Sequence, residues 1–514
     1  MKNNYLQTLF IALIVSLGGF LFGFDASVIS GVTKYIKPQF SLGELQLGWV
    51  VSAPTFSAMF AMLTAGSLSD WIGRKKVLIF VAFLYFISAV WSAFADGYTS
   101  LVIARMLGGL AFGAALVLAP VYIAEIAPPS YRGRLVSVQQ LNIVLGFSAA
   151  YFSNYWLQTS LENSDWLTDE TVWRWMFGLE CFPAILYFSL LFFVPPSPRW
   201  LILKGKPEMA RKVLNRILGA EAAEKEAQNI MQNIDEGKAK SGVQLSELFS
   251  SKLAFVMSVG LILGILQQVT GVNAIYFYAT TIFEQSGVGT NAAFAQAVWV
   301  GIINVIFTLI AMALIDKIGR KPLLMMGLLG IFISMGITSY GFSQARYQLD
   351  LQDLEALPGI REAQISPLMD KVFSNDVAYK KALIDALGLE TYRQHEGALV
   401  EAAIQMNPLI VLFGILGFVA SFAISLGPVM WVMLSEMYPN RIRALAISSI
   451  GFINSFSSWL VQFIFPWELA NWGNAYTYLI YALLAIVGFF WSYRFLPETK
   501  GRSLEELERE LIQS

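Results

Sequence analysis

Two charged side chains occur inside apolar stretches of this sequence, where charge is costly. Asp25 lies in the first stretch, six residues before its expected end near Gly31, and Arg105 lies five residues into the fourth stretch, after Ser100. At a helical rise of 1.5 Å per residue, both lie about 8–9 Å below the same side of the molecule. We therefore expect Asp25 and Arg105 to pair and to be candidate functional groups.

A buried carboxylate beside an arginine can exchange a proton. Burial favours the neutral acid and the arginine favours the carboxylate, so movement of Arg105 would switch Asp25 between proton uptake and release. The chain has one histidine, His395, and one cysteine, Cys181. These counts predict no metal site, no histidine relay and no disulfide within the chain. A static pair that only sets helix packing is the alternative interpretation.

Three amide side chains flank Gly271 in the seventh apolar stretch. Gln267 and Gln268 lie six and five residues before Asn273, so a regular helix would not place all three on one stripe. A break at Gly271 would let them converge. Amides donate and accept hydrogen bonds without carrying charge, which suits a ligand with many hydroxyl groups. Polar bonding between helices is the alternative.

The composition indicates that membrane-spanning helices position these residues. Of the 514 residues, 56% are hydrophobic and 14% are charged, where a soluble domain carries about 25% charged residues. The formal net charge of −1 predicts no nucleic-acid partner. About 20 apolar residues cross a bilayer as a helix. The twelve predicted spans are 8–31, 46–68, 77–95, 100–124, 135–158, 173–194, 253–284, 292–315, 322–342, 408–436, 444–467 and 473–496.

Basic residues concentrate in alternate loops, which predicts the orientation. One side holds Arg74, Lys75 and Lys76 after the second span, and the corresponding loops carry Arg132 and Lys317. The positive-inside rule makes this side cytoplasmic and places both termini there. We expect a multi-pass protein of the cell membrane that acts as a monomer, with the lipid bilayer as its surroundings. The first span is longer than the apolar part of a signal peptide, so we expect it to be retained.

The chain contains an internal sequence repeat. Asp70–Lys76 is repeated as Asp316–Lys321, and Glu125 with Arg132 is repeated as Glu436 with Arg443. We predict an all-α membrane protein with two pseudo-symmetric six-helix halves, which usually hold a substrate between them and rock to expose it alternately. The predicted units are an N-terminal half (1–194), a cytoplasmic helical linker (195–252), a C-terminal half (253–502) and a short cytoplasmic tail (503–514).

The second half carries about 65 additional residues between its third and fourth spans, at 343–405. Apolar residues recur there at helical spacing, for example Leu383, Ile384 and Leu387. Breaks are expected at Pro358-Gly359 and Pro367. We predict an external helical insertion, with a disordered loop as the alternative.

Several motifs together resemble the sugar porter branch of the major facilitator superfamily. The Asp70–Lys76 and Asp316–Lys321 loops resemble the signature loop of the superfamily. The sugar porter motifs are Glu125 through Arg132-Gly133-Arg134, Pro195 through Trp200, Gln267-Gln268 with Gly271 and Asn273, Gly427-Pro428 with Trp431, and Pro497 through Gly501. The resemblance covers about residues 8 to 502 apart from the insertion.

This resemblance implies site residues and a monosaccharide or polyol substrate. The implied substrate-binding residues are Gln140, Gln267, Gln268, Asn273, Asn304, Trp431, Phe22 and Tyr276. The implied proton-coupling residues are Asp25, Arg105 and Glu180; proton-coupled relatives have Asp at the first position and facilitative carriers have Asn. Phe147 and Phe452 stand where the bacterial xylose–proton symporter has glutamines, so another sugar is plausible.

The cytoplasmic motifs predict a gate. We expect Asp70 with Arg74, and Asp316 with Arg320, to bridge helix ends within each half. We expect Glu125, Arg132, Arg199, Glu436 and Arg443 to form ion pairs that hold the outward-facing state.

The main hypothesis is import of a hexose or pentose with a proton by alternating access, without a cofactor. A facilitative sugar uniporter or a polyol/inositol symporter is the alternative. A nutrient sensor is disfavoured because only about fourteen residues follow Lys500. The sequence contains no Walker-type phosphate loop and no constellation of catalytic residues, so neither ATP-driven transport nor an enzyme is expected.

Overall fold

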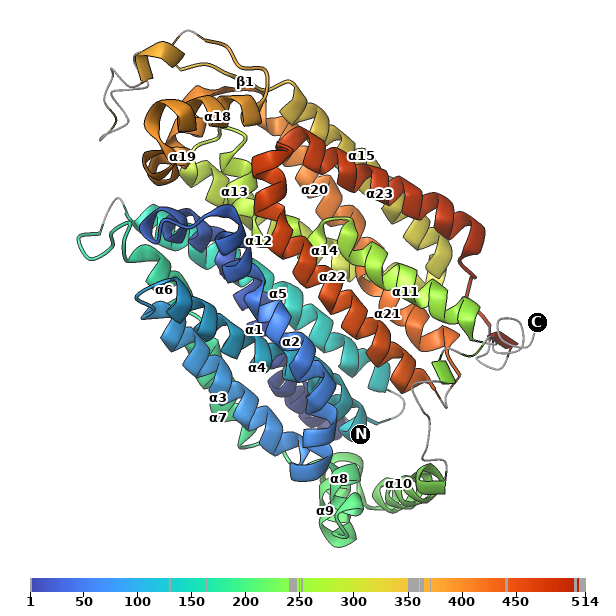
Figure 1. Cartoon of the computed structure of the whole chain (residues 1–514). Coiled ribbons are helices and arrows are strands. Elements are labelled where there is room, and N and C mark those ends of the chain that lie inside the picture. Colours follow the sequence, from blue (N-terminus) through green and yellow to red (C-terminus); the bar gives the residue numbers. More distant parts are fainter. Residues whose placement is uncertain are drawn as a thin grey trace.

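The computed structural model describes residues 2–128, 131–161, 164–239, 247–248, 250, 253–349, 360, 365–369, 371–439, 442–502 and 506–507. Two bundles of long helices lie side by side, blue to cyan for the N-terminal half and green to red for the C-terminal half (Figure 1). Helices α18 and α19 lie at one end of the bundles, which we call the insertion side. Helices α8, α9 and α10 lie at the opposite end, which we call the linker side (Figure 1).

The N-terminal half contains five long helices and two short ones. They are α1 (Lys2–Gln39), α2 (Glu44–Ile72), α3 (Arg74–Ala93), α4 (Tyr98–Ile126), α5 (Arg132–Ser160), α6 (Val172–Gly178) and α7 (Cys181–Leu191). The linker side then carries α8 (Pro198–Leu203), α9 (Pro207–Leu218) and α10 (Ala220–Ala239).

The C-terminal half repeats this order with two interrupted helices. Its helices are α11 (Ala254–Val269), α12 (Val272–Phe277), α13 (Ala279–Glu284), α14 (Thr290–Ile318), α15 (Arg320–Ser343), α20 (Pro408–Ile424), α21 (Leu426–Met437), α22 (Arg443–Asn471) and α23 (Asn474–Phe495).

The insertion between α15 and α20 folds around a small core of its own. It contains β1 (Arg346–Tyr347), the 3₁₀ helix η3 (Ser366–Leu368), α18 (Asp376–Leu387), α19 (Leu389–Ala403) and β2 (Ile404–Gln405). The predicted helical character is confirmed for α18 and α19, and η3 contains Pro367. The antiparallel pairing of β1 with β2 was not predicted, because two residues per strand leave no alternation to detect. The predicted break at Pro358-Gly359 and most of the predicted tail 503–514 lie outside the described residues.

Eleven helices of the described residues are long and apolar enough to cross a membrane. The remaining predicted span, 173–194, consists of α6 and α7, which are separated at Leu179 and Glu180. Pro183 explains this interruption, because it cannot donate a hydrogen bond to the carbonyl of Leu179 and prevents a continuous helix. The first span also differs from the prediction: the helix does not end near Gly31 but continues to Gln39.

Small residues bring the helices that carry the charged side chains into close contact. A Cβ added to Gly23 of α1 would lie 2.0 Å from the Ile143 carbonyl oxygen of α5, and one added to Gly146 would lie 2.0 Å from the Phe20 carbonyl oxygen. Gly109 of α4 meets the backbone of α2 in the same way, with its added Cβ 2.1 Å from the Pro54 carbonyl oxygen. Such backbone contact, which only glycine permits, is typical of helices packed in membranes.

Candidate functional site

The predicted break at Gly271 brings the three amides of the seventh span together. Gly271 adopts a left-handed conformation (φ +90°) between α11 and α12, and the Tyr481 ring lies 2.5 Å from where a Cβ would be. The backbone turn lets Asn273 Nδ2 donate to Gln268 Oε1 at 2.7 Å, and Gln268 Nε2 donates to Gln267 Oε1 at 3.2 Å. The break thus makes Gln268 and Asn273, five residues apart, direct hydrogen-bond partners, and Gln268 links them to Gln267.

Polar side chains of α22 complete this arrangement. Asn454 Nδ2 donates to Gln267 Oε1 (2.9 Å), and Asn454 Oδ1 accepts from Gln268 Nε2 (3.2 Å). Ser458 Oγ accepts from Asn273 Nδ2 (2.5 Å) and from Gln462 Nε2 (2.8 Å). We call the six side chains the polar cluster. Its members are Gln267, Gln268, Asn273, Asn454, Ser458 and Gln462.

A second helix break meets the polar cluster. The tenth span is interrupted at Ser425, where α20 ends and α21 begins. Pro428 accounts for the interruption because it has no N–H to donate to the Ile424 carbonyl. Gln267 Nε2 donates to the Leu426 carbonyl oxygen at this break (2.9 Å). Trp431, one turn beyond Pro428, is 43% exposed, so its ring is accessible next to the break.

The predicted aromatic residues form a wall that crosses the two halves. The ring centroids of Phe147 on α5 and Tyr276 on α12 are 5.0 Å apart, and Phe22 meets Phe147 edge-on at 6.3 Å. Tyr151 donates a hydrogen bond to the Tyr276 carbonyl oxygen (2.5 Å). Phe147 therefore provides ring contacts where a glutamine would provide hydrogen bonds.

The other two predicted amides lie apart from the polar cluster. Asn304 is buried in α14, whereas Gln140 is exposed on α5. Within the described part of the chain, no hydrogen bond joins either side chain to the polar cluster.

The predicted ion pair between Asp25 and Arg105 is present. Arg105 Nη1 lies 2.9 Å from Asp25 Oδ1, and Arg105 Nε donates to the Val50 carbonyl oxygen (3.2 Å). The guanidinium also lies over the Phe177 ring, 5.4 Å from its centroid. Asp25 is 5% exposed and Arg105 is fully buried, so water screens this pair little. The predicted depth of Asp25 is wrong: it lies fourteen residues, about 21 Å, before the end of α1.

Glu180 lies at the interruption between α6 and α7. Its side chain is buried, at 3% exposure, and it interacts electrostatically with both Asp25 and Arg105. Arg105 Nη2 has no hydrogen-bond partner among the described residues. Two buried carboxylates and one arginine therefore share this region of the N-terminal half.

The two halves meet on the insertion side. Ser30 and Thr280 hydroxyls lie 2.8 Å apart, and Lys34 Nζ lies 2.8 Å from Glu284 Oε1. Deeper in the molecule, the Thr55 hydroxyl donates to Gln462 Oε1 (3.0 Å). The described hydrogen bonds and ion pairs between the halves all lie on this side or near the middle of the helices.

The signature loops form matching ion pairs within each half. Arg74 contacts Asp70 (2.6 Å) and Glu125 (3.2 Å) in the N-terminal half. In the C-terminal half, Arg320 contacts Asp316 (3.1 Å) and Glu436 (2.8 Å). The expected bridges at the helix ends are thus present in both copies.

The other predicted gate residues do not join the halves in this conformation. Arg132 lies 3.9 Å from Glu226 of α10, and Arg443 Nε donates to the Tyr438 carbonyl oxygen (3.0 Å). Arg199 is exposed and makes no ion pair with another described residue. Glu125 and Glu436 pair instead with Arg74 and Arg320, each within its own half.

Comparison with known proteins places this arrangement in a family. The family model described as "Sugar (and other) transporter" matches residues 11–348 and 395–511. The chain belongs to this transporter family. It is 36% identical over 501 residues to the arabinose-proton symporter of Bacillus subtilis, with 97% of this chain and 94% of the relative covered. It is 34% identical over 530 residues to the D-xylose-proton symporter of Escherichia coli, with the same coverage.

Solved structures of relatives share the whole fold. The inward open structure of the xylose transporter XylE from E. coli matches with a TM-score of 0.75 at 30% identity, covering 98% of this chain and 100% of that one. XylE bound to 6-bromo-6-deoxy-D-glucose matches with a TM-score of 0.70 at 32% identity, covering 98% and 99%. This multi-pass membrane transporter therefore has the predicted twelve-helix architecture of two halves.

Three members of the polar cluster were not predicted from the sequence. Asn454, Ser458 and Gln462 follow each other at intervals of four residues on α22, which places them on one helix face. A polar stripe at that spacing inside an apolar span was the available signal. Phe452 was the residue of this span named from the sequence, whereas the amide of α22 that contacts Gln267 is Asn454, two residues further on.

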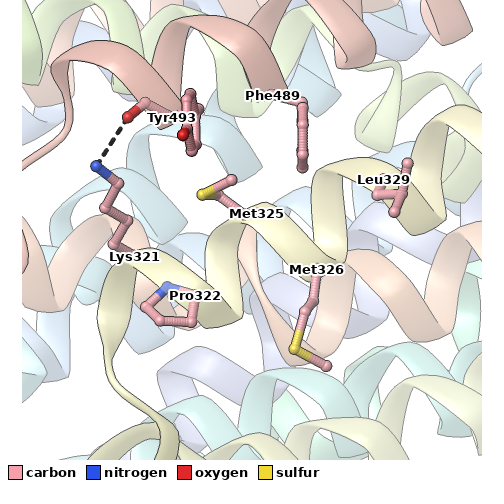
Figure 2. Close-up of a pocket in the computed structure, with 7 residues that line it drawn as sticks. All are labelled: Lys321, Pro322, Met325, Met326, Leu329, Phe489 and Tyr493. Carbon is pink, nitrogen blue, oxygen red and sulfur yellow. Dashed lines mark hydrogen bonds between the residues drawn. The ribbon is translucent and has the colours of Figure 1, made fainter.

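A separate pocket of about 390 Å³ lies on the flank of the transporter, between the linker-side ends of α15 and α23 (Figure 2). Met325, Met326, Leu329 and Phe489 make it apolar. Lys321 Nζ turns away from the pocket centre and donates to the Tyr493 carbonyl oxygen at 2.9 Å (Figure 2). A pocket lined mainly by apolar side chains does not suit a polyhydroxylated ligand, so the polar cluster remains the candidate site.

Proposed function

We propose that this protein imports a monosaccharide together with a proton by alternating access. The observation that carries the proposal is the buried ion pair between Asp25 and Arg105 (2.9 Å) in the N-terminal half. The C-terminal half holds the uncharged polar cluster. The two sites would bind different species. The polar cluster suits a neutral, hydroxylated molecule, and the Asp25 carboxylate can bind a proton. Relatives named as arabinose-proton and D-xylose-proton symporters support both parts.

The sugar would bind at the polar cluster and the aromatic wall. Amide groups of Gln267, Gln268 and Asn273 would donate to and accept from sugar hydroxyls, and they carry no charge that must be desolvated. Trp431 would pack against the apolar face of the sugar ring. Gln140 and Asn304, from α5 and α14, would close around the sugar when the linker side closes. Phe22 and Tyr276 would bound the site on the insertion side.

The proton would be carried by Asp25. Its protonation removes one of the two charges in a buried pair, which frees Arg105 to interact with Glu180. Arg105 would then be the group whose position differs between the proton-loaded and the empty states. Glu180 would provide the second carboxylate that keeps the arginine paired while Asp25 is neutral.

The conformation described here would be the inward-facing one. We assign the linker side to the cytoplasm, with both termini there, because the basic loops lie on that side. Residues 1–194 and 253–502 would be the two rocking units, joined by the linker 195–252. The predicted gate residues would pair across the halves in the outward-facing state. The protein would act as a monomer in the cell membrane.

Transport in proteoliposomes tests the proposal. D-xylose, L-arabinose, D-glucose and myo-inositol are added outside vesicles that contain the protein, and the external pH and radiolabelled uptake are recorded. We expect alkalinisation of the medium by at least one monosaccharide, because each imported sugar removes an external proton. Sugar uptake without a pH change would indicate a facilitative uniporter, and a response to myo-inositol alone would indicate a polyol symporter. No uptake of any of these compounds would contradict the proposal.

A further inference from the structure

The insertion is built into the C-terminal half. The pairing of Arg346 with Gln405 and of Tyr347 with Ile404 joins its two ends next to α15 and α20. Asp376 Oδ2 accepts hydrogen bonds from both the backbone N and the side-chain Nδ2 of Asn474, each at 3.0 Å, at the start of α23. An insertion attached at three helices of one half must move with that half.

The same insertion contacts the N-terminal half through a charged pair. Lys37 Nζ, near the end of α1, lies 2.5 Å from Glu396 Oε2 of α19. Their side chains are 17% and 14% exposed, so the pair is mostly shielded from water. When the two halves separate on the insertion side, this ion pair has to break.

Each member of the pair has a second partner in its own half. Lys37 lies 3.1 Å from Glu44 at the start of α2, and Glu396 lies 3.7 Å from Lys380 of α18. Breaking a shielded ion pair is costly when it leaves a charge without a partner. Here Lys37 would remain with Glu44, and Glu396 would remain with Lys380. The bridge between the halves can therefore open and close without leaving an unpaired charge.

We infer that the insertion is a reversible latch that holds the insertion side closed through Lys37 and Glu396. The latch sets the balance between the two orientations of the transporter, which is a task beyond binding sugar or proton. The inference rests on alternating access, but not on the identity of the sugar or on proton coupling.

Distances between spin labels test the latch without any substrate. Labels are placed at Thr99→Cys on α4 and Asn471→Cys on α22, two exposed positions on the insertion side, in a Cys181→Ser background. We expect Glu396→Gln and Lys37→Gln each to raise the ratio of long to short interspin distances about three- to ten-fold, because the remaining contacts then hold the closed state alone. Lys381→Gln, which removes an exposed lysine next to Lys380, is the matched control and should leave the distribution unchanged.

An unchanged distance distribution in folded Glu396→Gln protein would overturn the inference. If Glu396→Gln does not fold, the interspin distances of Lys37→Gln test the inference instead, and an unchanged distribution there would overturn it. Lys37→Gln leaves the insertion and its Lys380–Glu396 pair intact. An equal shift in the Lys381→Gln control would also overturn it, because the effect would then be one of total charge. A failed sugar or proton assay with a normal latch response would count against the proposed substrate and leave the latch supported.

Discussion

Thr55 of α2 donates a hydrogen bond to Gln462 of α22 at 3.0 Å, and this bond joins the N-terminal half to the polar cluster. Gln462 also donates to Ser458, which accepts from Asn273. One side chain therefore contacts both the opposite half and the chain of polar groups that would meet the sugar. Through Gln462, occupancy of the site and closure of the insertion side share a hydrogen-bond network.

Thr55→Val removes this contact while keeping the shape of the side chain. A net contribution of about 0.5–1.5 kcal/mol for one hydrogen bond predicts a two- to ten-fold loss of the closed state on the insertion side. The spin-label pair at positions 99 and 471 measures it. Thr64→Val on the same helix is the control, because the Thr64 hydroxyl donates to the Phe60 carbonyl oxygen within α2 (3.0 Å). Equal responses of the two variants would refute a specific role for Thr55.

Asp25→Asn should separate sugar exchange from accumulation. The amide cannot be deprotonated, so we expect sugar-driven alkalinisation to disappear and equilibrium exchange of labelled sugar to persist. Asp96→Asn, at an exposed carboxylate in the loop between α3 and α4, should behave as the wild type. Accumulation of sugar by Asp25→Asn against a gradient would contradict the coupling role.

Asn454→Ala should weaken sugar binding. The substitution leaves Gln267 and Gln268 without their partner on α22, and an unsatisfied buried group costs about 1–3 kcal/mol. We expect about a ten-fold rise in the sugar concentration that gives half-maximal uptake, measured with the sugar that drives alkalinisation. Asn471→Ala, at the exposed end of the same helix, is the control. A wild-type concentration dependence in Asn454→Ala would remove Asn454 from the site.

Arg74→Ala should destabilise the N-terminal half. Arg74 and Glu125 side chains are each 7% exposed, and loss of the arginine leaves a shielded carboxylate without its cation. The free energy of unfolding should fall by about 3 kcal/mol. Thermal unfolding in detergent measures the change, and Lys76→Ala in the same first turn of α3 is the exposed control. If both variants unfold at the wild-type temperature, the ion pair does not stabilise this half.

The latch should be insensitive to pH in the physiological range. Burial alone would raise the pKa of Glu396, but the charges of Lys37 and Lys380 lower it to about 2, below its usual 4.5. Because the folded-state pKa is lowered, the stabilisation is present above pH 4.5 and is lost as the pH falls towards 2. In a background with Asp25→Asn and His395→Gln, which removes the proposed proton carrier and the single histidine, we expect equal interspin distances at pH 5 and pH 8. A marked opening at pH 5 would contradict this assignment.

Composition and residue spacing are sufficient to identify the class of molecule and the kinds of residue that matter. Apolar spans of about 20 residues require helices, because lipid offers no hydrogen-bond partners to the backbone. Asp25 and Arg105 were identifiable as a pair because charge inside a span demands a partner. The repeat of Asp70–Lys76 as Asp316–Lys321 predicted two halves, and both copies form the same ion pairs.

Which side chains meet depends on the three-dimensional packing of the helices. The convergence of Gln267, Gln268 and Asn273 depends on the turn angle at Gly271, and their partners on α22 lie about 180 residues away in the chain. Glu180 lies at the interruption between α6 and α7 that Pro183 causes. The hydropathy of this span gives no sign of the interruption. The Lys37–Glu396 bridge depends on the continuation of α1 to Gln39 and on the fold of the insertion. Hydrophobic periodicity specifies which face of a helix is buried, but the packing of the two halves selects the residues that face each other.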